Sequence, residues 1–89
     1  MRLDKFLKVS RIIKRRTLAK EVAEQGRIYI NNVQAKASSN VKAGDELKIQ
    51  FGQKIVTASV DNIQENAKKE DAAMMYTIVK EERVEQTEE

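Results

Sequence analysis

The apolar residues at the start of the chain repeat with the spacing of an α-helix. They stand at positions i, i+3 and i+4 and so share one face of a predicted helix over residues 2–9: Leu3, Phe6 and Leu7. This apolar face predicts that the helix packs against a core. Asp4 and Lys8 are four residues apart on the same helix, which is the spacing of a weak ion pair.

A second helix is predicted over residues 18–25. Thr17 stands just before it, and a threonine hydroxyl at that position accepts a hydrogen bond from a backbone N–H of the first turn. Leu18 and Val22 lie one turn apart on its apolar face. Gly26 occupies the position just past the helix end, where the backbone needs a positive φ.

From residue 27 onward the apolar positions alternate, which predicts strands around 27–30, 33–37, 47–51 and 54–60. Asn31-Asn32 joins the first two strands, because Asn tolerates the left-handed backbone. Gly52-Gln53 fits a two-residue hairpin between the last two, with Gly at its first central position. Residues 66–75 are predicted to be helical and residues 76–79 extended. We therefore expect an α+β fold in which two N-terminal helices pack on a small antiparallel sheet.

The composition excludes several kinds of site. The 89 residues suffice for one domain and contain neither cysteine nor histidine, which excludes disulfides and makes a metal site improbable. No pair of carboxylates stands at an obvious site, and the glycines are wrongly spaced for a phosphate loop. We expect no cofactor and no enzymatic activity.

No apolar run approaches the roughly 20 residues of a membrane span, and nothing resembles a signal peptide. The expected location is the cytoplasm, without membrane contact, and the expected state is a monomer.

Charge is divided unevenly along the chain. Residues 1–54 hold 13 Lys/Arg and 5 Asp/Glu, whereas residues 55–89 hold 4 Lys/Arg and 9 Asp/Glu. A basic half joined to an acidic half is common in nucleic-acid-binding proteins. Within the first 20 residues only Asp4 opposes eight cations, which are Arg2, Lys5, Lys8, Arg11, Lys14, Arg15, Arg16 and Lys20. The alternative is a solvated helix face, but such faces usually mix both signs.

Lys14, Arg15 and Arg16 precede the second predicted helix, at the end where the helix dipole disfavours positive charge. The exposed backbone N–H groups of a helix start bind anions, and an Arg side chain binds phosphate bidentately. A phosphate placed between these groups would reverse the unfavourable electrostatics. The sequence thus predicts half of a phosphate site, which Arg27 extends, with cations that merely point into water as the alternative.

The expected nucleic acid is RNA. The helices are short for reading a DNA major groove, and their connection lacks the tight glycine-containing turn of a DNA-binding helix pair. Tyr29 is the only strand aromatic expected to be exposed, so a stacking platform is not predicted. Contacts are expected mainly with phosphate and sugar, and the lone turn lysines Lys36 and Lys42 are weaker candidates.

The stretch from Leu3 to Gln50 resembles the small RNA-binding domain named after ribosomal protein S4. Four blocks carry the resemblance in the family's order, and they are "RLDKFL", "KRRTLAKEV", "GRIYINN" and "VKAGDELKI". The family often has Asn-Gly where this chain has Asn31-Asn32, but a second Asn adopts the same conformation. With this resemblance we expect an S4-type domain over residues 1–60 and an extension packing on it over 61–80. The acidic composition and lack of an apolar pattern predict a flexible tail over 81–89.

The opening residues, the "FGQK" hairpin and "AAMMYTIVKEE" also resemble a stand-alone bacterial S4-type family that acts in ribosome-associated quality control and is related to the fifteen-kilodalton ribosome-associated heat-shock protein. This resemblance implies binding to stalled large ribosomal subunits that carry peptidyl-tRNA. It implies contact with large-subunit rRNA and with the tRNA, which is stabilised in the P site while RqcH directs alanine tailing.

The same resemblance carries RNA contact onto four arginines and three supporting cations, which are Arg2, Arg15, Arg16 and Arg27 with Lys5, Arg11 and Lys14. Lys8 and Lys20 complete the candidate surface because they belong to the same basic segment. The alternative is an RNA-binding module for a different RNA, as in a ribosomal or assembly protein or a translational regulator, since a fold alone does not determine function.

Overall fold

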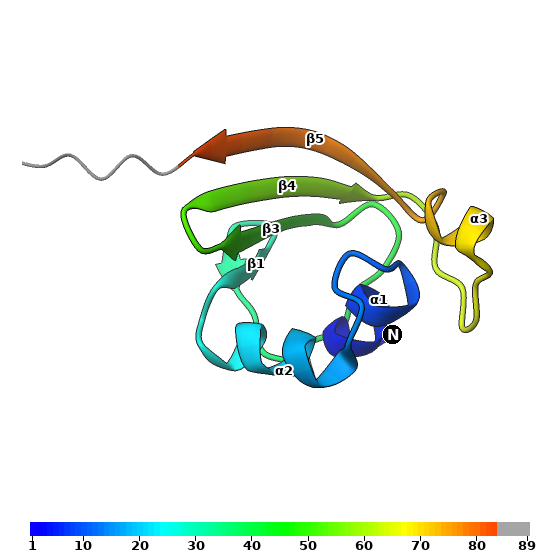
Figure 1. Cartoon of the computed structure of the whole chain (residues 1–89), viewed down its shortest axis with the longest axis horizontal. Coiled ribbons are helices and arrows are strands. Elements are labelled where there is room, and N and C mark those ends of the chain that lie inside the picture. The colour runs from blue at the N-terminus through cyan, green and yellow to red at the C-terminus, as the bar shows by residue number, and fades with distance from the viewer. Residues whose placement is uncertain (84–89) are drawn as a thin grey trace, which may run out of the picture.

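The computed structural model describes residues 1–83, which form helices and strands joined by turns and two longer connections over 35–45 and 61–68. In chain order the elements are α1 (Leu3–Val9), α2 (Arg16–Glu24), β1 (Ile28–Ile30), β2 (Val33–Gln34), β3 (Glu46–Phe51), β4 (Lys54–Val60), α3 (Lys69–Ala72) and β5 (Tyr76–Arg83). The strands form one sheet in the order β2-β1-β3-β4-β5, and all neighbouring strands are antiparallel. Helices α1 and α2 lie together on one side of this sheet, and β5 runs along the edge away from α2 (Figure 1). The predicted α+β class is confirmed.

The core lies between the helix pair and the sheet. Phe6 and Leu7 of α1 are fully buried, as are Leu47 and Ile49 on the alternate positions of β3. This alternation is why the β3 segment forms a strand with one covered face. The buried residues of α2 are instead the small ones, Ala19 and Ala23, while Leu18 remains 48% exposed. The small side chains let α2 approach its neighbours closely, and this brings the starts of α1 and α2 near each other.

Both predicted hairpin turns are present with the expected backbone. Asn31 and Asn32 have φ values of 52° and 69°, and Ile30 pairs with Val33 across the turn. Gly52 has φ 58° at the first central position of the second turn, where Phe51 pairs with Lys54. The two successive positive φ values at Asn31 and Asn32 are the pattern of a type I′ turn, whose twist matches that of the strands it joins.

The C-terminal end of α2 is closed by glycine as predicted. Gly26 has φ 76°, and its N–H donates to the carbonyl of Ala23 at 3.0 Å while the N–H of Arg27 donates to the carbonyl of Val22 at 3.3 Å. This pair of bonds is a Schellman motif. A Cβ at position 26 would collide with the side chain of Gln34, which itself donates to the Gly26 carbonyl. The positive φ, more than the contact with the flexible end of Gln34, is what favours glycine where the chain turns from α2 into β1.

The predicted role of Thr17 as a helix cap is wrong. Helix α2 begins at Arg16, its N-cap is Arg15 with an extended backbone, and no side chain caps it. The first helical bond runs from the Ala19 N–H to the Arg15 carbonyl at 3.0 Å. The guanidinium of Arg16 is held by Asp4 of α1, and we attribute the earlier helix start to this tertiary contact, which overrides the local capping preference of Thr17.

The C-terminal elements differ in length from the prediction. Helix α3 has one turn in place of residues 66–75, and β5 extends well beyond 76–79 because the whole edge of β4 is available for pairing, from Val60 opposite Tyr76 to Lys54 opposite Arg83. The expected acidic tail, 81–89, therefore starts inside this strand, and residues 84–89 lie outside the described part. Strand β2 is likewise shorter than 33–37.

Candidate nucleic-acid interface

A buried carboxylate organises the basic surface. Asp4 is only 3% exposed and accepts hydrogen bonds from two arginines on different elements. Arg2, at the N-cap of α1, donates from Nε and Nη2 to the two carboxylate oxygens at 3.3 Å each. Arg16, the first residue of α2, donates from Nη2 to Oδ1 at 3.4 Å, and the backbone N–H of Lys5 donates to the same oxygen at 2.7 Å. The sequence-based ion pair between Asp4 and Lys8 is absent from the described structure, because the carboxylate points to the arginines.

The two arginines are anchored but remain accessible. Their side chains are 52% exposed for Arg2 and 47% exposed for Arg16, although the Asp4 carboxylate between them is buried. A guanidinium has five N–H donors in a planar fork, so each arginine keeps donors beyond those given to Asp4. The arrangement presents two oriented cations, side by side, to an external anion.

The position of Asp4 also bears on the unfavourable charge at the start of α2. The helix dipole disfavours Arg16 at this end, and no acidic residue stands in the first turn of α2. Asp4 supplies that negative charge from the neighbouring helix. An anion from outside would add to this compensation, since the surrounding cations outnumber the single carboxylate.

The remaining candidate cations fall into two sets. Three of them line a hollow of about 260 Å³ next to the loop that precedes α3, and these are Lys8, Arg11 and Lys14. Lys5 reaches that loop too, through an ion pair with Glu65 at 2.5 Å. Arg15, Lys20 and Arg27 are exposed and form no ion pair within residues 1–83. The structure thus groups five of the nine predicted residues into two local arrangements, ties Lys5 to the loop before α3, and leaves Arg15, Lys20 and Arg27 outside these contacts.

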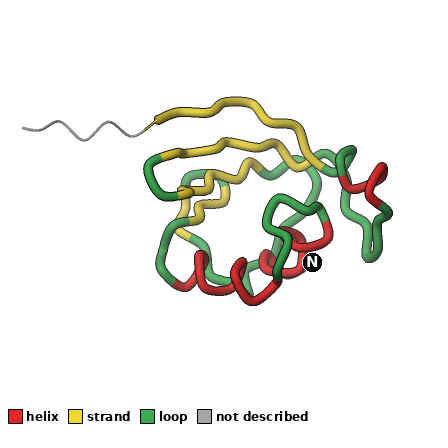
Figure 2. The backbone as a smooth tube through the Cα atoms, viewed as in Figure 1, coloured by secondary structure: helices red, strands yellow, loops and turns green. Residues whose placement is uncertain are grey.

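Sequence reasoning missed two contributors to this surface. Asp4 was predicted only as the partner of Lys8 in a weak ion pair, although its isolation among eight cations was a signal that it pairs with several of them. The extension over 61–80 was predicted to pack on the domain, but no contact of its loop over residues 61–68 with the basic helices was predicted. This loop lies beside α1 at the end of the sheet (Figure 2). Only the tertiary fold brings Glu65 against Lys5.

A second buried carboxylate, Asp45, plays a structural role. Asp45 is 4% exposed and accepts hydrogen bonds from the Asn31 amide and the Lys42 backbone N–H, each at 3.0 Å. Asn31 in turn accepts from the Glu46 N–H at 3.0 Å, so this group ties the β1–β2 turn to the start of β3.

The pKa values of Asp4 and Asp45 are both lowered, which predicts acid sensitivity. Burial raises each pKa, but the Arg16 hydrogen bond and charge at Asp4, and the backbone N–H of Lys42 at Asp45, outweigh it. A lowered native pKa means stability that is fully present above the unfolded value of about 4 and is lost as pH falls through the native value. We expect constant stability from pH 7 to about 5 and a decline below about 4, measured by urea unfolding. Asp45→Asn should make that decline shallower; an unchanged decline would show that Asp45 does not contribute.

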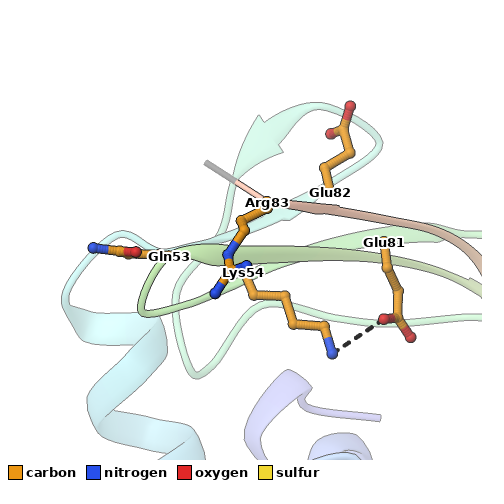
Figure 3. Close-up of a pocket in the computed structure, with 5 residues that line it drawn as sticks. All are labelled: Gln53, Lys54, Glu81, Glu82 and Arg83. Atoms are coloured by element: carbon orange, nitrogen blue, oxygen red, sulfur yellow. Dashed lines mark ion pairs between the residues drawn. The ribbon is translucent and has the colours of Figure 1, made fainter. Parts of the chain in front are cut away.

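A further hollow lies where the β3–β4 hairpin meets the end of β5 (Figure 3). It measures about 490 Å³, and its lining residues carry both signs of charge. Lys54 reaches toward Glu81 in an ion pair at 3.0 Å, while Glu82 points away from it and pairs with Lys80. Because two carboxylates line this hollow and Lys54 is already paired, it is a poor candidate for binding a polyanion.

Among residues 1–83 no group of His, Cys, Asp or Glu side chains is arranged to hold a metal ion. None of the helices described is long and apolar enough to cross a membrane.

Comparison with known proteins places the chain in a family. The S4 domain model matches residues 1–47. The chain is 70% identical over 84 residues to the RQC P-site tRNA stabilizing factor of Bacillus subtilis, covering 94% of this chain and 98% of that protein. It is 67% identical over 87 residues to the factor of the same name from Listeria monocytogenes, covering 98% and 95%.

Solved structures agree with these sequence relationships. The trimeric structure of Vibrio cholerae heat shock protein 15 superposes with a TM-score of 0.80 at 29% identity, covering 89% of this chain and 81% of that one. The relatives at 67–70% identity span nearly the full length of both chains. This chain therefore belongs to the S4-domain family and, within it, to the family of RQC P-site tRNA stabilizing factors.

Proposed function

We propose that this protein is a non-catalytic RNA-binding factor of bacterial ribosome-associated quality control. It binds stalled large ribosomal subunits that carry peptidyl-tRNA, contacts rRNA and tRNA, and stabilises the tRNA in the P site during RqcH-directed alanine tailing. The observation that carries the proposal is the 67–70% identity, over 94–98% of the chain, to proteins named for P-site tRNA stabilisation. The shared residues extend over nearly the full length of both chains, including the helices and the sheet.

The anchored arginine pair supports RNA contact at the start of the two helices. Arg2 and Arg16 are held by Asp4 and are half exposed, so little side-chain freedom is lost when they bind a phosphate. Arg15 stands beside Arg16 at the uncapped start of α2, where backbone N–H groups favour an anion. We assign the primary RNA contacts to these three residues.

The other basic residues add to the positive surface that the arginine pair begins. We assign supporting phosphate contacts to Lys8, Arg11, Lys14, Lys20 and Arg27. Lys5 is a weaker contributor because its ammonium group already pairs with Glu65. The stabilisation is a matter of differential binding: a factor that contacts rRNA and P-site tRNA together favours the tRNA position in which both contacts form.

A sucrose-gradient profile of the tagged protein from growing cells tests this proposal. The expected result is a small fraction of the protein confined to free large subunits, in fractions that also contain peptidyl-tRNA. Sedimentation at one copy per small subunit, or only at the top of the gradient, would contradict it and leave an RNA-binding module for a different RNA.

A further inference from the structure

We propose that the hollow between the α1–α2 connection and the loop before α3 is a second phosphate-binding pocket, which takes a backbone phosphodiester of RNA and uses Asn66 as well as cations. This inference rests on the proposed function and adds a defined subsite to its surface. The pocket is lined by Lys8, Val9, Arg11, Lys14, Asn66 and Ala67.

The charge of the pocket is unbalanced. Three of its six lining residues are cations, none is acidic, and within residues 1–83 none of the three cations takes part in an ion pair. Glu65, which precedes the lining residue Asn66, already forms an ion pair with Lys5. The volume of about 260 Å³ is several times the roughly 30 Å³ that a water molecule occupies in the liquid, so a hydrated phosphate group fits.

The basic wall of the pocket is held in place by its own backbone. Arg11 has φ 65°, a conformation that disfavours any residue with a branched or long side chain and suits Gly or Asn. Three hydrogen bonds hold this turn: Arg11 N–H to the Lys8 carbonyl at 3.1 Å, Ile12 N–H to the Ser10 hydroxyl at 3.4 Å, and Ile13 N–H to the Leu7 carbonyl at 3.1 Å. An arginine at a position whose positive φ favours Asn or Gly points to a use for its side chain.

The opposite wall is positioned by the C-terminal extension. Ile63 and Ala67 pack against the core, and Glu65 is tied to Lys5 of α1. Asn66 lines the same pocket as the basic turn, on a loop held by these contacts, and its amide supplies hydrogen-bond donors that suit a phosphate oxygen. The pocket exists only because this loop returns to α1, which gives the extension a part in RNA binding.

Two variants test the pocket without disturbing the fold. Arg11→Asn removes the cation and keeps a residue that tolerates positive φ, and Asn66→Asp inserts a carboxylate of the same shape. Lys54→Gln is the matched control, since it removes a cation at the Glu81 ion pair. Thermal unfolding should show all three folded.

The measurement is the affinity of each full-length protein for isolated large subunits carrying peptidyl-tRNA, at several KCl concentrations. Arg11→Asn should bind about tenfold more weakly, with a salt slope shallower by about 0.7–0.9, the value for one phosphate contact. Asn66→Asp should also weaken binding, and Lys54→Gln should change neither quantity. If the two pocket variants bind like the wild type while Arg16→Ala is weakened, the pocket proposal is overturned and the proposed function stands.

If the wild type itself does not bind these subunits, the proposed function fails. NMR titration then tests whether the pocket binds a phosphodiester. The probes are a short unstructured RNA and inorganic phosphate. Saturable shifts of the Arg11 and Asn66 amides with the RNA, lost in Asn66→Asp, would support a phosphodiester pocket. Shifts with inorganic phosphate alone would overturn it in favour of a free-anion site, and shifts with neither would overturn it outright.

Discussion

Arg16→Ala is expected to weaken binding to isolated large ribosomal subunits about ten- to a hundredfold. Arg16 is half exposed, lies at the start of α2 and is oriented by Asp4, so its guanidinium is ready to donate to a phosphate. A hydrogen bond to a charged group contributes about 1.5–3 kcal/mol, and each 1.4 kcal/mol is tenfold in affinity. Equilibrium binding of the labelled protein to purified subunits measures the effect.

Lys42→Ala is the matched control for this comparison. Lys42 is a cation with a side chain 82% exposed, and it too pairs with an aspartate, Asp45, at 3.6 Å. Its loss removes the same charge from a turn outside the basic helix pair, so affinity should stay within about twofold. Equal losses in the two variants would contradict the assignment of the site to the helix pair. A nearly flat dependence of wild-type affinity on salt would argue against phosphate contacts altogether.

Asp4→Asn is expected to weaken RNA binding even though it makes the protein more positive. If net charge alone determined the affinity, removing a carboxylate beside a basic surface should strengthen binding to a polyanion. The carboxylate, however, restrains Arg2 and Arg16 in the free protein, and each of these side chains has about 2 kcal/mol of rotamer entropy to lose on binding. Loss of this restraint should lower affinity for large subunits several-fold.

The same variant should also lower the stability of the protein. Removing the charge of Asp4 weakens hydrogen bonds that join α1 to Arg16 of α2, and the expected loss is about 1–3 kcal/mol in urea unfolding. The loss is smaller than for a fully buried pair because both guanidiniums are half exposed and regain water. Asp71→Asn, on the exposed surface of α3, adds the same charge as a control. Tighter binding by Asp4→Asn than by this control would mean that the basic surface acts through net charge and not through orientation.

A comparison of Asp4→Asn with Asp71→Asn separates the effect of the amount of positive charge from the effect of its arrangement.

The arginine pair and the pocket beside the loop before α3 fix their cations before RNA binds. A buried carboxylate orients the first, and a hydrogen-bonded turn orients the second. A protein that must favour one position of a tRNA benefits from both, because contacts that are ordered beforehand discriminate between positions better than mobile charges do.

Much of the fold was predictable because it depends on local patterns. The spacing of Leu3, Phe6 and Leu7, the glycine at position 26 and the Asn31-Asn32 turn each act within a few residues, and all three predictions are confirmed. The prediction that Thr17 caps a helix over 18–25 is wrong for the opposite reason: a contact between helices, from Arg16 to Asp4, outweighs a local preference. The length of β5 likewise depends on the free edge of β4, which has no local signature.

The sequence by itself determined the class of fold, the basic segment and the kind of ligand that such a segment attracts, since composition and short-range spacing are enough for these. It also identified all nine candidate cations, but it did not show which of them lie together in space. Only the tertiary structure decided which cations act together, because Asp4 reaches Arg16 across 12 positions and Glu65 reaches Lys5 across 60. Contacts over such separations exist only once the chain has folded, and they turn a cluster of charges into a surface with a defined geometry.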